Sequence, residues 1–251
     1  LMQDQVDGLR LNGVPAAATH SNLDADGRRE LREMSESGAL RLLFVAPERL
    51  FRGDFLEWLG RQDVAAIAID EAHCISQWGH DFRPEYRRLA ELRERFDGVP
   101  IHAYTATATP RVREDIKAQL TLKDPVELVG TFDRAELTYR VLPRQGLIEQ
   151  VVEAIGRHRD AATIVYCISR KDTETLSSQL QSRGIEAKAY HAGLPAEERT
   201  QLSADFRAER LHVVCATVAF GMGIDRSDVR LVVHAAMPKS IEHYQHCLLY
   251  T

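Results

Sequence analysis

The most informative stretch of the chain is V-A-A-I-A-I-D-E-A-H-C-I-S-Q-W-G-H-D-F-R-P-E-Y, from Val64 to Tyr86. Its first part, Val64 to Ile69, is short and wholly apolar, and it ends abruptly at the adjacent carboxylates Asp70 and Glu71. Such a run predicts a buried parallel strand, and open α/β sheets bind ligands at the carboxyl ends of their strands. The sequence therefore predicts an α/β fold with an acidic site at the tip of this strand.

Two adjacent carboxylates at a strand tip suit the hydrolysis of a nucleoside triphosphate. One acid holds Mg²⁺, which draws charge off the β and γ phosphates, and a second group orients or deprotonates the attacking water. We assign Asp70 to Mg²⁺ and Glu71 to the water. A bare Asp-Glu pair is also the ordinary acidic start of a loop after a core strand, but the longer run D-E-A-H and the residues after it favour the catalytic interpretation.

The loop that follows combines aromatic, basic and polar side chains. Within nine residues it carries Trp78, His80, Phe82, Arg83 and Tyr86. On a loop, aromatic rings and an arginine can simply pack against the hydrophobic core. The same mixture grips single-stranded nucleic acid, because bases stack on the rings and arginine meets phosphate.

Residues 70–86 resemble the Walker B motif and the aromatic-rich loop of the RecQ helicases. The resemblance implies a superfamily-two motor with two tandem RecA-like lobes of the P-loop NTPase fold, ATP and Mg²⁺ between them and DNA across their top. It also implies DNA unwinding in the 3′ to 5′ direction, a role in recombination and repair, and single-stranded DNA and single-strand/double-strand junctions as partners. His73 would contact the nucleotide, and Gln77 and Trp78 would couple DNA to it.

Other segments of the first half resemble further motifs of this family. Residues 1–6 are similar to the end of motif Ia, residues 46–50 to motif Ib and residues 105–108 to motif III. The resemblance implies a phosphate contact for Arg49, with a surface ion pair as the alternative, and coupling roles for Thr105 and Thr107. Thr109 is better explained as the N-cap of a helix that begins at Pro110.

The second half continues the resemblance in the same order. Residues 164–170 are similar to motif IV, residues 189–194 to the motif after it, and residues 216–225 to motif V. Paired glycines let the backbone approach a ligand, and an aspartate accepts from a ribose hydroxyl. The expected DNA contacts are Ser169, Arg170 and Thr217, and the expected nucleotide contacts are Gly221, Gly223 and Asp225. A helix N-cap explains Ser169 equally well.

Apolar runs and amphipathic segments alternate in both halves, which predicts two α/β units. Strands are expected at 14–19, 41–45, 64–69, 99–104, 125–129, 163–167, 185–190, 212–216 and 231–235. Helices are expected at 1–12, 24–37, 84–95, from 110, and at 146–159, 169–182, 195–207 and 238–245. We predict a first lobe at 1–131, a linker at 132–145, a second lobe at 146–245 and a non-native tail at 246–251.

The composition places limits on the function. A net charge of −5 and a pI near 6.1 give no overall basic signal, so nucleic acid must bind to a local patch. The four cysteines form no C-x-x-C pair and are expected to be buried thiols in a reducing compartment. No apolar run approaches the ~18 residues of a membrane span. We expect a cytoplasmic protein, in the bacterial cytoplasm or nucleoid, with no membrane partner.

The sequence contains no Gly-Lys pair, and the resemblance stops after Gln245 without an arginine. Enzymes of this class cradle phosphates with a G-x-x-x-x-G-K-S/T loop and use an arginine finger. We therefore expect an incomplete and inactive fragment of a DNA-stimulated ATP hydrolase.

Three alternatives remain open. They are a DNA-binding module without ATPase activity, an RNA helicase, against which the W-G-H-D-F-R-P loop argues, and a metal hydrolase that uses Asp70, Glu71, His73 and His80, whose histidine spacing matches no zinc pattern.

Overall fold

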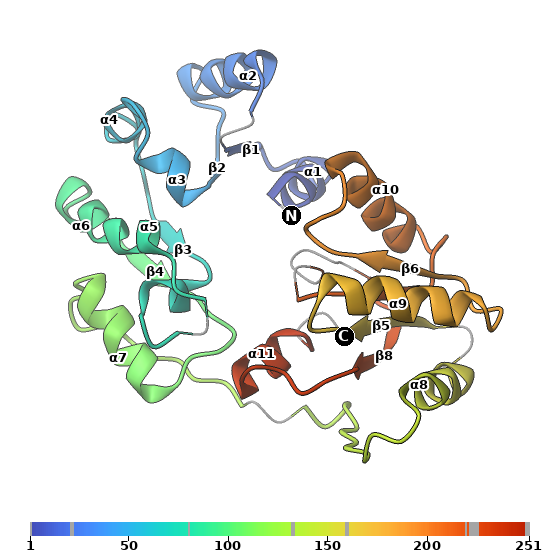
Figure 1. Cartoon of the computed structure of the whole chain (residues 1–251). Coiled ribbons are helices and arrows are strands. Elements are labelled where there is room, and N and C mark those ends of the chain that lie inside the picture. Colours follow the sequence, from blue (N-terminus) through green and yellow to red (C-terminus); the bar gives the residue numbers. More distant parts are fainter. Residues whose placement is uncertain are drawn as a thin grey trace. The chain divides into compact units, whose positions relative to one another are not determined.

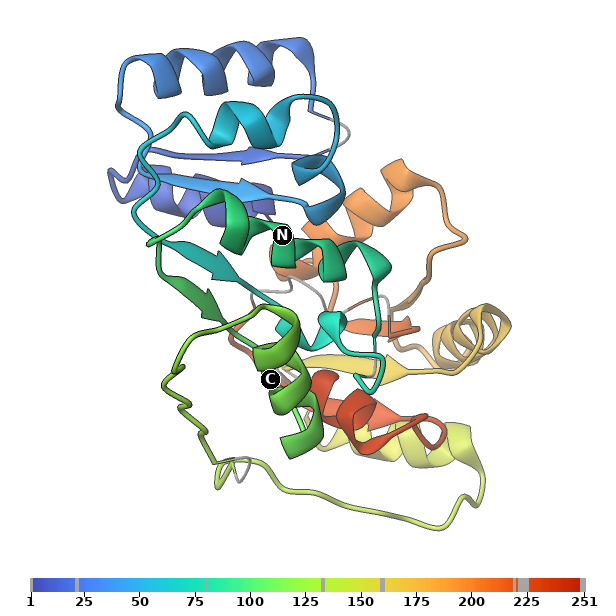
Figure 2. The same cartoon turned by 90° about the vertical axis from the view of Figure 1, so that its left-hand side faces the viewer.

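The computed structural model describes residues 2–20, 23–79, 81–131, 134–158, 161–218, 220 and 226–248. The chain forms two compact units, Leu1–Val126 and Glu127–Thr251. In each unit helices pack on short strands (Figure 1 and, turned by 90°, Figure 2). Within the described ranges, the helices are all too short or too polar to cross a membrane.

The first unit begins with two strands and two helices. Its elements are α1 (Met2–Leu11), β1 (Ala16–Thr19), α2 (Ala25–Glu36) and β2 (Leu42–Val45). β1 and β2 pair in parallel, with Ala16 opposite Leu42. Val6 of α1 is buried against the small side chains of β1. This layer forms because alanines let the helix approach the strand closely.

The rest of the first unit surrounds a second parallel pair. Its elements are α3 (Pro47–Leu50), α4 (Phe55–Leu59), β3 (Ile67–Ile69), the 3₁₀ helix η1 (Ala72–Ile75), α5 (Pro84–Arg87), the 3₁₀ helix η2 (Arg88–Ala90), α6 (Glu91–Arg95), β4 (Ile101–Ala103) and α7 (Pro110–Gln119). β3 pairs with β4 so that Ile69 lies opposite Ala103. The helices bury one core that includes Ile69, Ile75 and Ile116. This core fixes η1 and α7 next to the strand tips.

The second unit is a three-layer α/β/α arrangement. Its elements are α8 (Leu147–Gly156), β5 (Ala162–Tyr166), α9 (Arg170–Gln181), β6 (Ala187–Tyr190), α10 (Ala196–Arg207), β7 (Val213–Ala216), β8 (Val229–His234) and α11 (Ile241–His246). The strands are parallel in the order β6-β7-β5-β8. Ile164 of β5 packs with Phe206 of α10, whereas its neighbour Val165 packs with α8 and α9. Strand alternation thus supplies both faces of the sheet.

The structure corrects three expected elements. The strand expected at 64–69 covers only Ile67–Ile69, and Ala68 is exposed, because β3 pairs with β4 alone among the described strands. The helix expected at 84–95 is broken by η2, where the hydrogen bonds tighten to a 3₁₀ pattern. The strand expected at 125–129 is wrong, since Leu128 is 90% exposed and no strand forms there.

The remaining expected helices and strands are confirmed, with ends shifted by a few residues. The finer division into a lobe at 1–131, a linker at 132–145, a lobe at 146–245 and a tail at 246–251 stays a prediction.

Candidate functional site

The tips of β3 and β4 are joined by backbone hydrogen bonds. The amide of Tyr104 donates to the carbonyl of Ile69 at 2.8 Å, and the amide of Ala72 donates to the carbonyl of Tyr104 at 2.9 Å. These bonds continue the parallel pairing past the last strand residue. The carboxylates that follow β3 are therefore held beside Thr105, which follows β4.

Glu71 occupies an uncommon backbone conformation. Its φ of 50° and ψ of 39° lie in the left-handed region, and its amide donates to the Asp70 carboxylate at 2.8 Å. This conformation costs an ordinary residue roughly 1–2 kcal/mol. The turn lets η1 begin immediately and leaves Asp70 exposed while Glu71 is half-buried. Burial, and next the charge of Asp70, raise the pKa of Glu71, and the opposing effect of Arg83 is smaller.

His73 links the two strand tips. Its ring is buried, and its Nδ1 lies 3.0 Å from Oγ1 of Thr105 and 3.3 Å from Oε2 of Glu71. The Thr105 hydroxyl donates to the carbonyl of Thr107 at 3.2 Å, so it accepts from His73, which places a proton on Nδ1. The structure thus brings four predicted residues, Glu71, His73, Thr105 and Thr107, into one hydrogen-bonded series.

The loop after η1 folds back onto His73. The amide of Gly79 donates to the carbonyl of Ser76 at 3.1 Å, and the amide of Trp78 donates to Oγ of Ser76 at 3.1 Å. A Cβ atom on Gly79 would overlap the backbone carbonyl of His73, so only glycine permits this close approach. Gln77 and Trp78 are exposed at the turn, and His80 lies outside the described residues.

The second part of the loop is held by its own residues. The Arg83 guanidinium contacts the Asp81 carboxylate, with an Nε to Oδ2 distance of 3.0 Å, and the Arg83 amide donates to the carbonyl of Cys74 at 2.9 Å. Phe82 is half-buried, and the guanidinium of Arg87 lies 5.1 Å from its ring centroid. Arg83 is therefore already paired, a partnership that the sequence did not indicate.

Arg49 lies on α3, in the same unit as β3 and β4. Its guanidinium stacks on Phe55, 4.7 Å from the ring centroid, and donates to the carbonyl of Arg52 at 2.9 Å. The surface ion pair considered for Arg49 is not formed with any described residue. Thr109 is confirmed as the N-cap of α7, since its hydroxyl accepts from the amide of Val112 at 3.4 Å.

All four cysteines are buried and free. Burial raises the pKa of Cys74, next to His73, to about 12. A thiol with this pKa is neutral at physiological pH and unreactive. In the part of the chain that the structure describes, no cluster of three or more His, Cys, Asp or Glu side chains could hold a metal ion.

In the second unit, three predicted DNA contacts meet at the carboxyl edge of the sheet. Ser169 and Arg170 follow β5 and are exposed, and Thr217 follows β7, its amide donating to the carbonyl of Tyr190 at 3.2 Å. Ser169 caps α9 by accepting from the amide of Asp172 at 3.1 Å, with the reciprocal bond of a capping box. The N-cap interpretation is confirmed, and DNA contact at Ser169 stays a prediction.

The turn after β6 adds a residue that sequence reasoning left without a role. His191 is buried, its Nε2 lies 3.1 Å from Oε1 of Glu174, and its Nδ1 accepts from the amide of Gly193 at 3.2 Å. A Cβ atom on Gly193 would lie 2.9 Å from Nη1 of Arg170. The turn therefore supports Arg170. The available signal was a histidine at the end of a predicted strand, directly after Tyr190.

Gly221, Gly223 and Asp225 lie outside the described residues, but the residues on either side of them are buried. The Tyr166 hydroxyl donates to the carbonyl of Phe220 at 2.8 Å. Arg226 donates to the carbonyl of Leu211 at 2.7 Å and to the carboxylate of Asp228 at 2.8 Å. Nothing in the residue pattern indicated that an arginine after the motif would be buried.

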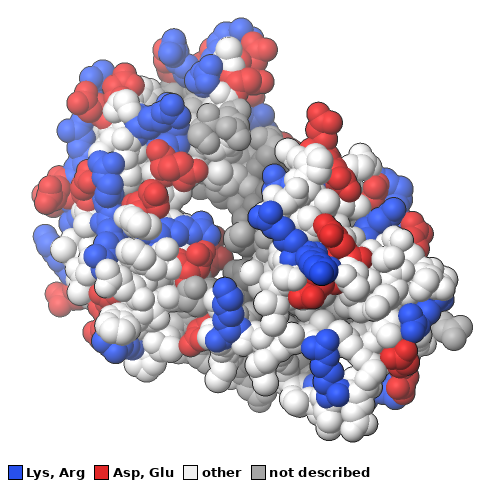
Figure 3. Space-filling model, viewed as in Figure 1, with Lys and Arg blue, Asp and Glu red and all other residues white. Residues whose placement is uncertain are grey.

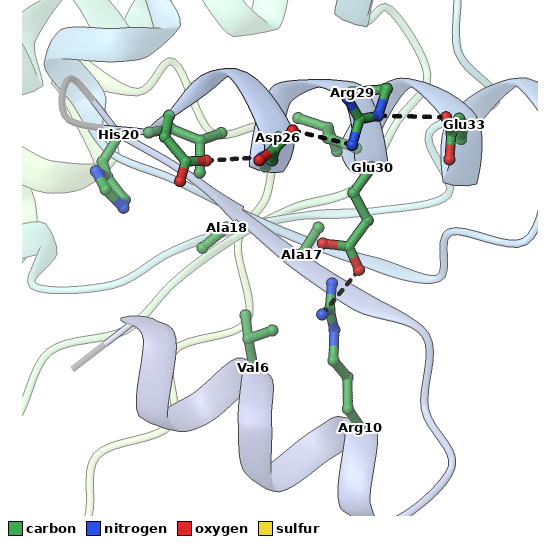
Figure 4. A pocket seen from close by; sticks show the side chains of 13 residues that line it. Val6, Arg10, Ala17, Ala18, His20, Asp26, Arg29, Glu30 and Glu33 are labelled. Carbon is green, nitrogen blue, oxygen red and sulfur yellow. Dashed lines mark hydrogen bonds and ion pairs between the residues drawn. The ribbon is translucent and has the colours of Figure 1, made fainter.

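A separate cavity of about 670 Å³ lies between α1, β1 and α2 (Figure 4). Its charged side chains pair with each other, Arg10 with Glu30 at 3.0 Å and Arg29 with Asp26 at 2.9 Å. None of the predicted site residues lines it.

On the face seen in Figure 3, positive and negative side chains of the described residues are interleaved. This pattern agrees with the expectation that any nucleic acid would be bound by a local set of residues rather than by a broad basic surface.

Comparison with known proteins gives a consistent result. Residues 1–116 match the family model of the DEAD/DEAH box helicases, and residues 146–248 match that of the helicase conserved C-terminal domain. The chain is 42% identical to the ATP-dependent DNA helicase RecQ of Pasteurella multocida over 97% of its own length and 39% of the relative's. It is 40% identical to the RecQ-like DNA helicase BLM of Xenopus laevis, over 100% of the chain and 20% of that protein.

The fold is also found among solved structures. The structure of the helicase Lhr of Mycobacterium smegmatis bound to ssDNA and AMP-PNP matches with a TM-score of 0.66 at 21% identity, over 100% of the chain and 35% of Lhr. The chain thus spans about two-fifths of the bacterial relative and less of the larger proteins.

Proposed function

The chain belongs to the RecQ group of the DEAD/DEAH box helicases, and we propose that its two units are motor lobes of an ATP-dependent DNA helicase. The observation that carries the proposal is the hydrogen-bonded series from Glu71 through His73 to Thr105, with the loop of residues 76–83 closed onto His73. This arrangement joins a carboxylate pair to an exposed aromatic surface. A motor needs such a connection because hydrolysis must respond to DNA.

The donor set at the strand tip fits Mg²⁺, which prefers carboxylate oxygens and retains several waters. Asp70 is exposed and uses one oxygen for the Glu71 amide, so its other oxygen is available to a metal or to its water. Bound Mg²⁺ would supply charge neutralisation at the β and γ phosphates of ATP. Glu71 accepts the proton of the attacking water, and His73 fixes the orientation of the Glu71 carboxylate.

On the second lobe, we propose that Gly221, Gly223 and Asp225 contact the nucleotide. Support comes from the buried residues at both ends of this segment, Phe220 and Arg226. Anchored ends reduce the conformational entropy that the segment loses on binding.

Single-stranded DNA, and junctions of single with double strands, are the proposed partners. In the first lobe the proposed contacts are Arg49, Trp78, Phe82 and Arg83, and in the second they are Ser169, Arg170 and Thr217. Support comes from the exposed ring of Trp78 and from the shared sheet edge in the second lobe. We also propose translocation in the 3′ to 5′ direction, a role in recombination and repair, and a cytoplasmic location.

Coupling between DNA and nucleotide is assigned to Gln77, Trp78, Thr105 and Thr107. A base that stacks on Trp78 moves the turn at Gly79, which touches the backbone of His73. His73 in turn contacts Thr105 and Glu71. DNA that binds Trp78 can therefore shift the Glu71 carboxylate through two intervening residues, Gly79 and His73.

The test is ATP hydrolysis by the full-length protein that carries this sequence, with and without single-stranded DNA, beside a Glu71→Gln variant. DNA-stimulated hydrolysis that disappears in the variant supports the motor. DNA binding without hydrolysis would instead support the second candidate, a binding module. We further propose that the 251 residues alone do not hydrolyse ATP, and the same assay on that chain checks this.

A further inference from the structure

The exposed ring of Trp78 is stacked by an arginine from another element. The guanidinium carbon of Arg111, the second residue of α7, lies 3.3 Å from the centroid of the ring. Trp78 remains 60% exposed beneath this contact. Among the described residues, the Arg111 guanidinium makes no hydrogen bond or ion pair with another side chain. Its five donors are therefore free to meet a ligand.

Local helix energetics do not explain an arginine at this position. The first turn of α7 contains Arg111 and Arg113 and no acidic residue. The amide end of a helix carries partial positive charge, so a cation there is unfavourable. Arg113 offsets this by donating to the carbonyl of Ala108 at 3.1 Å, whereas Arg111 has only the ring. Because Arg111 opposes this local preference and its guanidinium contacts only the Trp78 ring among the described residues, its position indicates a functional role.

Trp78 and Arg111 together match one nucleotide of a single strand. A base can stack on the indole, and a guanidinium can form two hydrogen bonds to the neighbouring phosphate. Base stacking on an aromatic side chain is stronger than a cation–π contact at an exposed site. A base therefore displaces Arg111 from the ring, and the released guanidinium is left beside the backbone of the same strand.

We propose that Arg111 is a phosphate contact for single-stranded DNA that covers the Trp78 ring until a base replaces it. The proposal rests on the proposed function, because it adds a residue to the same DNA surface. It also explains how an exposed indole is shielded in the absence of DNA. The partner chemistry is a base next to a phosphodiester, which a folded protein surface does not offer.

The experiment measures binding of fluorescein-labelled oligothymidylate to the full-length protein by anisotropy over a range of salt concentrations. Arg111→Ala is expected to weaken binding about tenfold at low salt. It is also expected to lower the slope of log K against log salt by about 0.7, the value of one phosphate contact on a single strand. Arg111→Lys retains the slope, because the charge remains.

Arg88→Ala is the matched control. The guanidinium of Arg88 also lies over a ring in the same unit, 4.1 Å from the centroid of the partly buried Phe51 and outside the loop, and its charge is paired with Glu91 at 2.9 Å. Its removal is expected to leave both the affinity and the salt slope unchanged. An equal effect of Arg88→Ala would show that general charge, not this site, binds the strand, and would overturn the proposal.

A second readout reports on the ring itself. The chain has two tryptophans, so Trp58→Phe leaves Trp78 as its only indole. In the 251-residue chain with this substitution, oligothymidylate is expected to quench the fluorescence of Trp78, and Arg111→Ala is expected to shift the titration to higher DNA concentration. Thermal unfolding of Arg111→Ala should match that of the unchanged protein, because relief of the cation at the helix N-terminus offsets the lost contact with the ring.

The outcomes separate the two proposals. An unchanged salt slope, or tighter binding by Arg111→Ala, would show that Arg111 only covers the ring and would overturn this inference alone. A loss of thermal stability would assign Arg111 a structural role and would also overturn it. Absence of DNA binding by the unchanged full-length protein would overturn the proposed function, and this inference with it.

Discussion

The hydroxyl of Thr105 lies 3.0 Å from Nδ1 of His73, and this contact ties the segment after β4 to the 3₁₀ helix after β3. The same Nδ1 lies 3.3 Å from the carboxylate of Glu71. A buried histidine with two acceptors on one nitrogen has little freedom to rotate. The orientation of Glu71 thus depends on both strands, and substitutions on either strand are expected to alter catalysis.

Glu71→Gln removes the proton acceptor but keeps the shape of the side chain. In the full-length protein, ATP binding should persist, because Asp70 and the backbone are unchanged. Turnover should fall by about 10² to 10⁴, the usual contribution of a general base. A fluorescent ATP analogue and a phosphate-release assay measure the two effects. Near-normal turnover would exclude Glu71 from the role of base.

Thr105→Val deletes the hydroxyl between His73 and the carbonyl of Thr107. The loss of these bonds should cost about 1 kcal/mol of stability. It should also lower the DNA-stimulated kcat while changing the KM for ATP less, because His73, which orients the Glu71 carboxylate, is no longer held by Thr105. Steady-state kinetics with and without DNA measure this, and a change confined to KM would contradict the coupling role.

Thr163→Val is the matched control for that experiment. Thr163 is a buried threonine, whereas Thr105 is half-buried, and the Oγ1 of Thr163 has no hydrogen-bond partner among the described residues. Removing an unsatisfied buried hydroxyl is expected to leave the kinetics unchanged and to be neutral or to stabilise the fold by up to about 1 kcal/mol.

Gly79→Ala places a methyl group against the backbone carbonyl of His73. The turn must move, so DNA stimulation should fall severalfold while hydrolysis without DNA changes less. Gly156→Ala is the control, since Gly156 lies in α8 and an added Cβ meets no atom within 4 Å. Because Gly156 is the last residue of α8, that change should stabilise the helix by less than the ~1 kcal/mol typical of an interior position. Equal losses of basal and stimulated activity in Gly79→Ala would indicate a packing role for the loop.

The pair of Arg226 and Asp228 predicts a pH dependence of stability. The hydrogen bond from Arg226, with its charge as a smaller contribution, lowers the pKa of Asp228 despite partial burial. Because the folded pKa is below the unfolded value of about 3.9, the stabilisation is complete above that value and is lost as pH falls through the folded pKa.

Urea unfolding of Asp228→Asn across pH measures this effect. The variant should be less stable than the unchanged protein near neutral pH, and the difference should shrink from about pH 4 downward. A difference that does not vary with pH would mean that the carboxylate charge contributes nothing.

Several features followed from the sequence alone. The apolar run before Asp70 and Glu71 predicted a parallel strand that ends in acids, and alternating apolar segments predicted two α/β units. Thr109 was expected to be an N-cap, and an N-cap was one of two equal interpretations of Ser169, because capping depends only on residues within one turn. These features are local, or repeat with the period of a helix or strand, so the order of residues specifies them.

Tertiary structure decided the contacts between distant residues. Thr105 meets His73, Gly79 meets the carbonyl of His73, and Arg111 covers Trp78, because β3 and β4 pair in one register and α7 packs on η1. Periodicity reports which face of an element is apolar, but it carries no information on which side chain of another element lies opposite. That choice is made by strand register and loop conformation, and it determines how the site can work.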